Sequence, residues 1–474
     1  MDELNLPENG RIHMIGIGGA GMSGLAAVMA EMGRRVSGSD LQATPVTARL
    51  ESLGVKVFRG HNAANVSGAD LVVASAAVPA DNPELCAARE MGLPILGRAE
   101  MLGRLMSGTL GVAVSGTHGK TTTTSMLADV LEAGGLDPTV IIGGDLDRLN
   151  GNARLGKGKV FLTEACEAFN SFLELRSTIA VVTNIEADHL DFHGSLEGVI
   201  HSFERFLSQI EPNGCAVLCV DCPNVRAVMP SITRRIVSYG LSPDAEFRAA
   251  DTDIESQHAS FRILHRVRDC GRFTLKVAGR HNVVNALAAA AVGRELGLDF
   301  HIIRKALAEF HGAGRRFEVL GTAAGVTVVD DYAHHPTEIR ATLAAARGWG
   351  GRVVAVFQPH LFSRTRTFLN EFAESLSAAD LILLTEIYPA REKPIPGVSA
   401  SLIVDAIKAR FPGKDVVFVS EKDRVAETLG PSLQPGDVVV VMGAGDIRAA
   451  AEMLLSMLGS TPEGRASSVQ VKET

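Results

Sequence analysis

One stretch of the sequence, residues 109–124, limits the possible folds more than any other. It reads Thr-Leu-Gly-Val-Ala-Val-Ser-Gly-Thr-His-Gly-Lys-Thr-Thr-Thr-Thr, and a helical pattern follows from 125 to 133. An apolar strand, a glycine-containing turn, a Lys-Thr pair and a helix in this order are typical of a nucleotide phosphate-binding loop, where backbone N–H groups and a helix N-terminus face anionic oxygens. The pattern predicts that Lys120 reaches the β- and γ-phosphates and that the Thr121 hydroxyl ligates magnesium.

The loop departs from the usual pattern at one position. That pattern places a glycine five residues before Gly119, where this chain has Val114, and Gly116 stands two residues later instead. A chance Gly-Lys-Thr in an ordinary turn is the alternative interpretation. The strand before the loop and the helix after it favour phosphate binding.

Composition excludes several classes of partner. The 474 residues are enough for about three domains. A net charge of −8 argues against nucleic acid or an anionic membrane as partner. The six cysteines include one CxxC, Cys219 to Cys222, without a second pair, so we expect a reduced chain and no zinc site. The uncharged stretch Met14–Ala30 lacks a basic leader, which argues against a signal peptide or membrane span. We expect a cytoplasmic protein, monomeric or homodimeric.

The first third of the chain predicts a second nucleotide-binding turn. A short strand at 11–15 runs into Gly16, Gly18 and Gly21, which satisfy GxGxxG, and an apolar helix follows at 25–32. Such a turn lets the backbone approach a diphosphate. Asp40 ends the next strand, at the distance expected for a ribose contact. Further strands at 55–58, 71–75 and 94–96 with helical patterns between them predict an open parallel α/β sheet.

Polar residues follow two apolar strands in the middle third. Glu164 ends the strand 160–164, and the strand at 179–184 leads into Asp188, His189 and Asp191. Beside a phosphate loop, such residues are placed to hold magnesium or position a γ-phosphate. We rank Glu164 and His189 as metal candidates and expect Asp191 to cap a helix.

A helical pattern after Gly279 carries Asn282 and Asn285, three residues apart and so on one face. Their amides suit the edge of a purine, with helix capping as the alternative.

The segment 311–314 is the best linker candidate, and βα alternation restarts beyond it, which predicts a third, smaller parallel-sheet domain. Polar clusters end its strands at 330–336, 358–365 and 443–446.

Together these motifs resemble the Mur ligases, the ATP-dependent amino-acid-adding enzymes of peptidoglycan synthesis. The motifs are GIGGAGMSG at 16–24, GTHGKTTTT at 116–124, TNIEADHLD at 183–191, GRHNVVNALAA at 279–289, GAGRRFE at 312–318, DDYAHHPTEI at 330–339 and FQPHLFSRT at 357–365. The resemblance implies three α/β domains: an N-terminal Rossmann-like UDP-sugar domain at 1–107, a central P-loop ATPase-type domain at 108–312, and a C-terminal Rossmann-like amino-acid-binding domain at 313–474. We expect its tail, 459–474, to be disordered.

The resemblance also implies a reaction. GGAGMSG and DYAHHP favour the branch that adds L-alanine to the lactyl carboxylate of UDP-N-acetylmuramic acid, using ATP and Mg²⁺. The γ-phosphate would move onto the carboxylate, and the alanine amine would then attack the acyl phosphate. Charge develops on phosphoryl oxygens, so the site needs cations and N–H donors more than a nucleophile. A related Mur ligase that adds another amino acid or peptide is the alternative.

Matched position by position, the resemblance implies roles for individual residues. The nucleotide would be bound by Gly116, Thr117, His118, Gly119, Lys120, Thr121, Thr122, Asn282, Asn285, Arg316 and Asp331. Within this set Asn285 would contact adenine, Arg316 the phosphates and Asp331 the ribose. Magnesium would be held by Thr121, Glu164 and His189. The sugar nucleotide and other substrate groups would contact Gly18, Gly19, Ser39, Asp40, His61, Ser75 and Tyr332. The catalytic set would be Lys120, His118, Asn184, His189, His334, His335, His360 and Arg364.

Some of these positions have a structural alternative. His334 and His335 could form a satisfied turn before Pro336, and Ser75 could belong to an ordinary turn after a strand. Three features depart from the family pattern: Cys166 replaces an acidic residue, Leu361 replaces an arginine, and no lysine lies between Lys159 and Lys276, where many members carry a modified one.

Two functions of other classes were weighed against the ligase. An oxidoreductase is supported by GxGxxG at 16–21 and by nothing else. A UDP-sugar-binding protein without catalysis is suggested only by Cys166 and Leu361. The phosphate loop argues against the first, and the intact set of Lys120, Thr121, Glu164 and His189 argues against the second.

Overall fold

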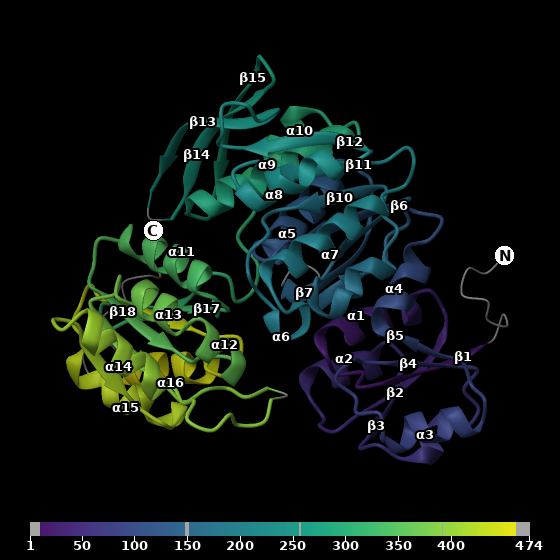
Figure 1. Cartoon of the computed structure of the whole chain (residues 1–474), viewed down its shortest axis with the longest axis horizontal. Helices are drawn as coiled ribbons and strands as arrows, with labels where there is room; N and C mark the ends of the chain where they lie inside the picture. The colour runs from purple at the N-terminus through teal and green to yellow at the C-terminus, as the bar shows by residue number, and fades with distance from the viewer. Residues whose placement is uncertain (1–9, 147–150, 256, 391, 461–474) are drawn as a thin grey trace. The chain divides into compact units, whose positions relative to one another are not determined.

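The computed structural model describes residues 10–146, 151–255, 257–390 and 392–460. The chain divides into two compact units. The first contains Met1–Thr252, Ser260–Leu275 and Asn282–Phe310, and the second contains Asp253–Ala259, Lys276–His281 and His311–Thr474. The first unit holds two β-sheets and the second holds one (Figure 1).

The N-terminal sheet has five parallel strands in the order β3-β2-β1-β4-β5. The strands are β1 (Arg11–Ile15), β2 (Arg35–Asp40), β3 (Lys56–Arg59), β4 (Leu71–Ala74) and β5 (Ile95–Gly97). The connecting helices are α1 (Ala20–Glu31), α2 (Pro45–Ser52), the short 3-10 helix η1 (Ala63–Val66), α3 (Pro83–Glu90) and α4 (Arg98–Met106). The chain leaves β1 in one direction to β2 and returns on its other side as β4. The glycine turn after β1 therefore lies at a switch point, where α/β sheets bind ligands.

The central sheet has ten strands in the order β15-β14-β13-β12-β11-β10-β6-β9-β7-β8. They are β6 (Leu110–Ser115), β7 (Thr139–Leu146), β8 (Gly151–Arg154), β9 (Val160–Glu164), β10 (Ile179–Val182), β11 (Cys215–Cys219), β12 (Arg235–Gly240), β13 (Phe247–Ile254), β14 (Ala259–His265) and β15 (Arg268–Leu275). Pairings from β13 through β7 are parallel, and β7 pairs with β8 antiparallel. Because β6, β10 and β11 are buried on both faces, they read as continuous apolar runs.

The helices of the central part connect some of its strands or follow the last of them. They are α5 (Lys120–Ala133), η3 (Ala168–Glu174), α6 (Leu190–His193), α7 (Leu196–Ser208), α8 (Pro223–Val228), η4 (Met229–Ser231), α9 (Arg280–Glu295) and α10 (Phe300–Ala308). Helix α7 buries Val199, Phe203 and Phe206 at helical spacing. The rings of Phe203 and Phe206 pack against the ring of Phe172, at centroid distances of 5.2 and 4.8 Å respectively. This face covers the sheet beside the phosphate loop.

The second unit is built on a six-stranded sheet in the order β16-β17-β21-β18-β19-β20. Its strands are β16 (Glu318–Ala323), β17 (Val326–Asp331), β18 (Val353–Phe357), β19 (Leu381–Leu384), β20 (Asp415–Phe418) and β21 (Val438–Met442). All pairings are parallel except that of the edge strand β16. Its helices are α11 (Pro336–Arg347), α12 (Phe362–Thr367), α13 (Leu369–Leu376), α14 (Ser401–Arg410), η5 (Lys422–Arg424), α15 (Val425–Leu429), η6 (Gly430–Ser432) and α16 (Arg448–Ser460).

The predicted α/β fold class is confirmed, with three separate sheets. Strands β7, β8, β13 and β16 were not predicted, and α5 begins at Lys120 rather than at 125. Residues 459 and 460, predicted as part of a disordered tail, belong to α16, and the rest of that tail lies outside the described residues. The domain boundaries at 107/108 and 312/313 stay a prediction.

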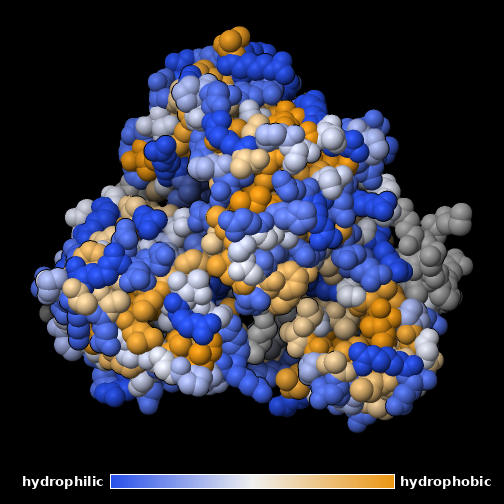
Figure 2. Space-filling view, viewed as in Figure 1, coloured by the Kyte–Doolittle hydropathy of each residue, from blue (hydrophilic) through white to orange (hydrophobic). Residues whose placement is uncertain are grey.

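One face of the surface, coloured by hydropathy, is shown in Figure 2. Hydrophobic and hydrophilic residues alternate over the face displayed in Figure 2. Among the described helices, none combines the length and apolar composition needed to cross a bilayer.

Candidate active site

The phosphate loop lies between the carboxyl end of β6 and helix α5. Val114 is the residue where the usual loop has a glycine, and here it is a buried strand residue paired with Val181 and Glu164. The strand continues to Ser115, so the turn starts one residue later, at Gly116. Gly116 and Gly119 have φ values of 136° and 79°, which side-chain-bearing residues rarely adopt. Val114 thus belongs to strand β6, and Gly116 is the first glycine of the turn in this chain.

The loop is held by the segment that follows β10. Asn184 Oδ1 accepts a hydrogen bond from the His118 N–H at 2.8 Å, and Asn184 Nδ2 donates to the His118 carbonyl at 3.1 Å. The Thr183 hydroxyl donates to the same carbonyl at 2.6 Å. A Cβ at Gly116 would collide with the Thr183 hydroxyl oxygen, so the close approach requires glycine. Asn184, predicted as catalytic, lies beside the loop and fixes its backbone.

Lys120 forms an ion pair with Glu167. Its Nζ lies 3.0 Å from both carboxylate oxygens and donates to the Thr117 carbonyl at 3.1 Å. Burial lowers the pKa of Lys120, but the charge of Glu167, with smaller effects of Cys166 and Glu164, raises it above its ordinary value. The amine therefore stays protonated while it is buried. A polyphosphate in the loop would compete with Glu167 for this cation.

Two of the predicted metal ligands lie against the same strand, β7. A Cβ at Gly143 would come 2.7 Å from Glu164 Oε2, and one at Gly144 would come 3.3 Å from Thr121 Cγ2. The two glycines thus leave room for the carboxylate and for the first turn of α5. The hydroxyl of Thr121 in the first turn of α5 and the carboxylate of Glu164 at the end of β9 are oxygen donors that suit a hard cation such as Mg²⁺.

His189, the third predicted ligand, lies after β10 with left-handed backbone angles, φ 52° and ψ 35°. Its N–H donates to Asp188 Oδ1 at 2.8 Å, and its Nε2 lies 3.8 Å from Asp188 Oδ2. His189 is the N-cap residue of α6, so Asp191, predicted as the cap, instead lies in the first turn of that helix.

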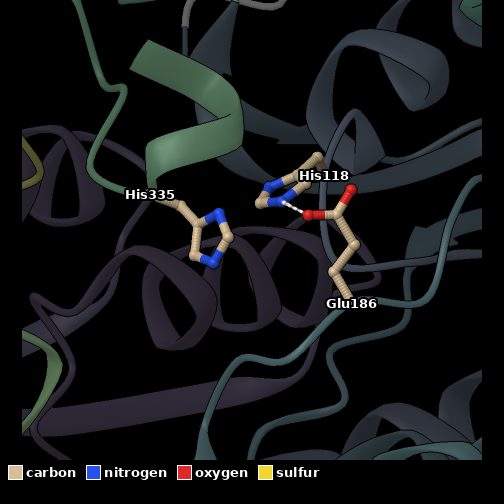
Figure 3. A group of neighbouring side chains, drawn as sticks. All are labelled: His118, Glu186 and His335. Atoms are coloured by element: carbon tan, nitrogen blue, oxygen red, sulfur yellow. Dashed lines mark ion pairs between the residues drawn. The ribbon is translucent and has the colours of Figure 1, made fainter. Parts of the chain in front are cut away.

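His118 inside the loop is paired with a residue that sequence reasoning missed. Its Nε2 lies 3.4 Å from Glu186 Oε2, the interaction marked in Figure 3. The Glu186 N–H also donates to the Thr117 hydroxyl at 2.8 Å. Glu186 lies in the TNIEADHLD motif, so the signal for it was present in the sequence, but it was read only as part of an acidic cluster.

Helix α9 brings Asn285 to the phosphate loop. A Cβ at Gly119 would come 2.7 Å from Asn285 Oδ1, and Asn285 Nδ2 donates to Asn282 Oδ1 at 3.4 Å. Both amides are buried. Because α9 begins at Arg280, neither asparagine is the N-cap residue of this helix.

In the second unit, Asp331 is the last residue of β17, and its carboxylate holds the segment that carries Arg316 by a hydrogen bond. Its Oδ2 accepts from the Phe317 N–H at 3.1 Å and from the Thr342 hydroxyl at 2.9 Å, and its Oδ1 accepts from the Ala333 N–H. Burial raises the pKa of Asp331 to about 6, although Arg316 and the hydrogen bonds from Ala333 and Thr342 oppose the rise.

Tyr332 lies between two guanidinium groups. The ring centroid is 5.0 Å from the Arg315 guanidinium carbon and 5.1 Å from that of Arg316, distances typical of cation–π contacts. The Arg316 guanidinium also lies 3.8 Å from Glu338. The predicted nucleotide-binding residues Arg316 and Asp331 and the predicted substrate-binding Tyr332 therefore form one group.

His334, His360 and Arg364 form a second group. The two imidazole centroids are 5.7 Å apart, and Arg364 Nη1 lies 3.1 Å from His360 Nδ1. Tyr388, which sequence reasoning missed, stacks on His360 at 5.9 Å. These residues follow the carboxyl ends of β17, β18 and β19. Because these strands are parallel, their carboxyl ends lie at the same edge of the sheet and bring the residues together.

His335, drawn in Figure 3, has a different setting. It is the N-cap residue of α11 and accepts a hydrogen bond from the Thr337 N–H at 3.3 Å, while Glu338 accepts one from the His335 N–H. This geometry agrees with the satisfied turn that was the alternative for the histidine pair. The His334 N–H donates to the same Glu338 oxygen at 3.0 Å, so both histidines take part in this turn, while the His334 ring lies against His360.

The sugar-nucleotide positions meet at the switch point of the N-terminal sheet. The Gly18 N–H donates to Asp40 Oδ2 at 2.8 Å, and the Gly19 N–H donates to the Gly16 carbonyl. Gly16, with φ 76°, lies against Ser75, where a Cβ would be 3.3 Å from the serine Cβ. Ser39 and His61 lie 3.0 Å apart and share a carboxylate, Glu84, which sequence reasoning missed.

Comparison with known families covers most of the chain. Residues 11–109 match the Mur ligase family catalytic domain, residues 114–293 the Mur ligase middle domain, and residues 315–445 the Mur ligase glutamate ligase domain. The chain belongs to the Mur ligase family.

Individual members of the Mur ligase family align over nearly the whole chain. The UDP-N-acetylmuramate–L-alanine ligase of Geobacter sp. (strain M21) is 49% identical over 96% of this chain and 98% of its own length. That of Myxococcus xanthus (strain DK1622) is 45% identical over 95% and 96%. The crystal structure of UDP-N-acetylmuramate–alanine ligase from Thermotoga maritima superposes with a TM-score of 0.81 at 31% identity, covering 97% of this chain and all of that one.

The departure at Cys166 from the Mur ligase pattern has a local explanation. Burial, together with the charge of Glu167, raises the pKa of the Cys166 thiol, which therefore stays protonated and uncharged. The carboxylate that faces Lys120 comes from Glu167, one residue later. Leu361, the other departure, is buried with φ 69° and donates its N–H to the Tyr388 carbonyl.

The contact between Gly119 and Asn285 predicts a selective effect of Gly119→Ala. The substitution should cost about 1–2 kcal/mol of stability from the left-handed backbone and also displace Asn285. Gly135→Ala is the matched control, because Gly135 has φ 72° in the turn after the same helix and no atom within 4 Å of its Cβ position. Thermal denaturation should show similar losses for both variants. Only Gly119→Ala should weaken Mg-ATP binding in calorimetry, by about tenfold or more; equal nucleotide affinity of the two variants would contradict the contact.

The raised pKa of Asp331 predicts a pH-dependent stability. The folded state binds a proton more tightly than the unfolded state, so the stability of the wild type should fall as the pH rises from about 4 to about 6. In urea denaturation, Asp331→Asn should therefore gain up to about 3 kcal/mol relative to wild type over this interval.

Asp380→Asn is the control for this measurement. The hydrogen bonds from Arg347 lower the pKa of Asp380, so this variant should change relative to wild type only below about pH 4, and in the opposite sense. A flat difference between wild type and Asp331→Asn from pH 4 to 7 would refute the prediction.

Proposed function

We propose that this chain joins L-alanine to the lactyl carboxylate of UDP-N-acetylmuramic acid at the expense of ATP, a step in peptidoglycan precursor synthesis. The observation that carries the proposal is the phosphate loop with Lys120, Thr121 and Glu164 around it, in a chain 49% identical to a UDP-N-acetylmuramate–L-alanine ligase. We propose that the protein is cytoplasmic, acts on these small molecules alone, and is monomeric or homodimeric.

The reaction needs activation because a carboxylate is a poor electrophile. A carboxylate oxygen attacks the γ-phosphorus of ATP, the bond to the β-phosphate oxygen breaks, and an acyl phosphate and ADP form. The alanine nitrogen then attacks the acyl carbon, loses a proton, and the tetrahedral intermediate expels inorganic phosphate. The products are the amide, ADP and phosphate, so no redox partner is required.

The phosphate loop supplies positioning and positive charge for this transfer. Lys120, kept protonated, neutralises charge on the β- and γ-phosphates once the nucleotide displaces Glu167. Thr121, Glu164 and His189 would hold Mg²⁺, which when bound neutralises phosphoryl oxygens. The N–H groups in the first turn of α5 would face the same oxygens, whereas those of Thr117 and His118 already donate to Asn184. Asn285, against Gly119, is placed to bind the adenosine part.

The remaining substrate groups are assigned to the other two sheets. The glycine turn after β1, with Asp40, Ser39, His61 and Ser75, binds the sugar nucleotide. In the second unit, His334, His360, Arg364 and Tyr332 bind the amino acid and the acyl phosphate, and Arg316 and Asp331 bind ATP. Arg364 is a fixed cation suited to the alanine carboxylate, a role that Leu361 cannot fill.

An oxidoreductase has little support beside this proposal. GxGxxG also suits a UDP-diphosphate, and a phosphate loop with Lys120 has no use in hydride transfer. A related Mur ligase that adds another amino acid or peptide remains the second candidate, since the same loop would serve it.

The decisive assay measures phosphate release from ATP with Mg²⁺, UDP-N-acetylmuramic acid and a panel of amino acids. We expect release that requires both the sugar nucleotide and L-alanine, because the lactyl carboxylate accepts the phosphoryl group and the alanine amine then accepts the acyl group and releases phosphate. Omission of either substrate is the control. Release with an amino acid other than alanine as the preferred substrate would favour the second candidate, and hydride transfer with NAD would overturn the proposal.

Lys120→Ala should abolish phosphate release while UDP-N-acetylmuramic acid still binds. The lysine neutralises transferring phosphate, whereas the sugar nucleotide lies on a different sheet. Isothermal titration calorimetry should give a dissociation constant within about twofold of wild type. Lys157→Ala, which changes an exposed lysine of the same unit, should leave both readings unaltered. Loss of sugar-nucleotide binding in Lys120→Ala would show that the two sites are not separate.

A further inference from the structure

A buried carboxylate lies behind two of the proposed sugar-nucleotide residues. Glu84, in the first turn of α3, is fully buried. Its Oε2 accepts hydrogen bonds from the Ser39 hydroxyl and from His61 Nδ1, the latter at 3.3 Å. Its Oε1 accepts from Asn65 Nδ2 and from the Asn62 N–H. The carboxylate therefore ties β2, the loop after β3, η1 and α3 together.

A histidine on strand β1 also faces Glu84. His13 is fully buried on β1, with Nε2 3.6 Å from Glu84 Oε2 and Nδ1 3.0 Å from the Ser37 hydroxyl. The groups that face Glu84 are thus hydrogen-bond donors from each neighbouring element. Although burial raises the pKa of Glu84, the nearby His13 ring and hydrogen bonds from Ser39, Asn65 and Asn62 hold it at about 2, so the carboxylate is ionised at neutral pH.

The hydrogen bonds fix the proton of His61. An ionised carboxylate can only accept, so the Ser39 hydroxyl must donate its single proton to Glu84. Ser39 Oγ, 3.0 Å from His61 Nδ1, can then only accept from the ring. Both neighbours of Nδ1 are therefore acceptors, and Nδ1 must carry a hydrogen. A neutral His61 consequently has a bare Nε2 that can accept a hydrogen bond.

We infer that Glu84 is a positioning residue for the sugar nucleotide, because it holds Ser39 in place and fixes His61 as the Nδ1–H tautomer with Nε2 as an acceptor. The complementary ligand group is a hydrogen-bond donor, either the N–H of the uracil ring or a ribose hydroxyl. This inference rests on the proposed function, which assigns Ser39 and His61 to UDP-sugar binding. The side chain of His61 is 17% exposed, whereas Glu84 is fully buried and acts only through its neighbours.

A purely structural role for Glu84 makes a different prediction. In that case a change at Glu84 would lower stability without a preferential effect on one substrate. The positioning role predicts a selective loss, since the proposed phosphate loop and its hydrogen bonds lie on another sheet.

The test is Glu84→Gln in the full-length protein, with binding of UDP-N-acetylmuramic acid and of Mg-ATP measured separately by calorimetry. The amide keeps one acceptor oxygen and replaces the other by an NH2 donor, so either Ser39 and His61 or Asn62 and Asn65 would lose their acceptor, and the arrangement that holds Ser39 and His61 would no longer be satisfied. We expect the dissociation constant for the sugar nucleotide to rise about tenfold or more and that for Mg-ATP to stay within about twofold. Glu84→Asp, which keeps the charge, should recover part of the loss.

Asp437→Asn is the matched control. Asp437 is a buried carboxylate paired with Arg352 in the second unit, so this variant also replaces a buried carboxylate by an amide. It should lose stability but keep sugar-nucleotide affinity. Equal affinities of Glu84→Gln and wild type for UDP-N-acetylmuramic acid, or equal losses in Glu84→Gln and Asp437→Asn, would overturn the inference.

A second measurement does not depend on any variant of Glu84 folding. In protein labelled with ¹⁵N-histidine, the His61 signals, assigned by their absence in His61→Gln, should show a protonated Nδ1 and an unprotonated Nε2 near pH 8. The opposite tautomer would overturn the inference. Failure of wild type to bind UDP-N-acetylmuramic acid, with the tautomer as expected, would instead count against the proposed function.

Discussion

The placement of β6 between β9 and β10 determines most of the candidate site. Since the strands are parallel, their carboxyl ends meet at one edge, and each delivers a different chemical group there. Strand β6 delivers the phosphate loop, β9 delivers Glu164, and the segment after β10 delivers Asn184 and Glu186. None of these groups is near the others in the sequence. The sheet order alone makes them neighbours.

The loop conformation depends on contacts that sequence patterns show only in part. The Lys-Thr pair and the glycines predicted phosphate binding, because backbone geometry leaves a direct trace in glycine spacing. The pairing of Lys120 with Glu167 and of His118 with Glu186 left no such trace, since acidic residues after a strand are equally compatible with metal binding and capping. Sequence patterns therefore predicted a candidate site but did not assign partners within it.

The same limit applies to the fold. Buried parallel strands such as β10 and β21 form apolar runs between helical patterns and were predicted close to their observed bounds. Strands β7, β8 and β16 were missed: β7 contains Gly143 and Gly144, and β8 and β16 lack a strong apolar pattern. The glycines that obscure β7 are required, because Glu164 and Thr121 occupy the space that side chains would need. The close packing of Glu164 and Thr121 against the glycines thus made β7 harder to recognise as a strand from the sequence.

The hairpin of β7 and β8, which the sequence patterns did not predict, also connects the two sheets of the first unit. Asn152 on β8 donates to the Ser23 hydroxyl at 3.2 Å and to the Ala20 carbonyl, both in the first turns of α1. A Cβ at Gly24 of α1 would lie 3.3 Å from Ile141 and Ala153, so this helix and the hairpin are in direct contact. Because β7 also borders Glu164, a shift of α1 relative to the central sheet must break the Asn152 hydrogen bonds or move the strand beside Glu164. The hairpin therefore constrains the distance between the glycine turn before α1 and the phosphate loop.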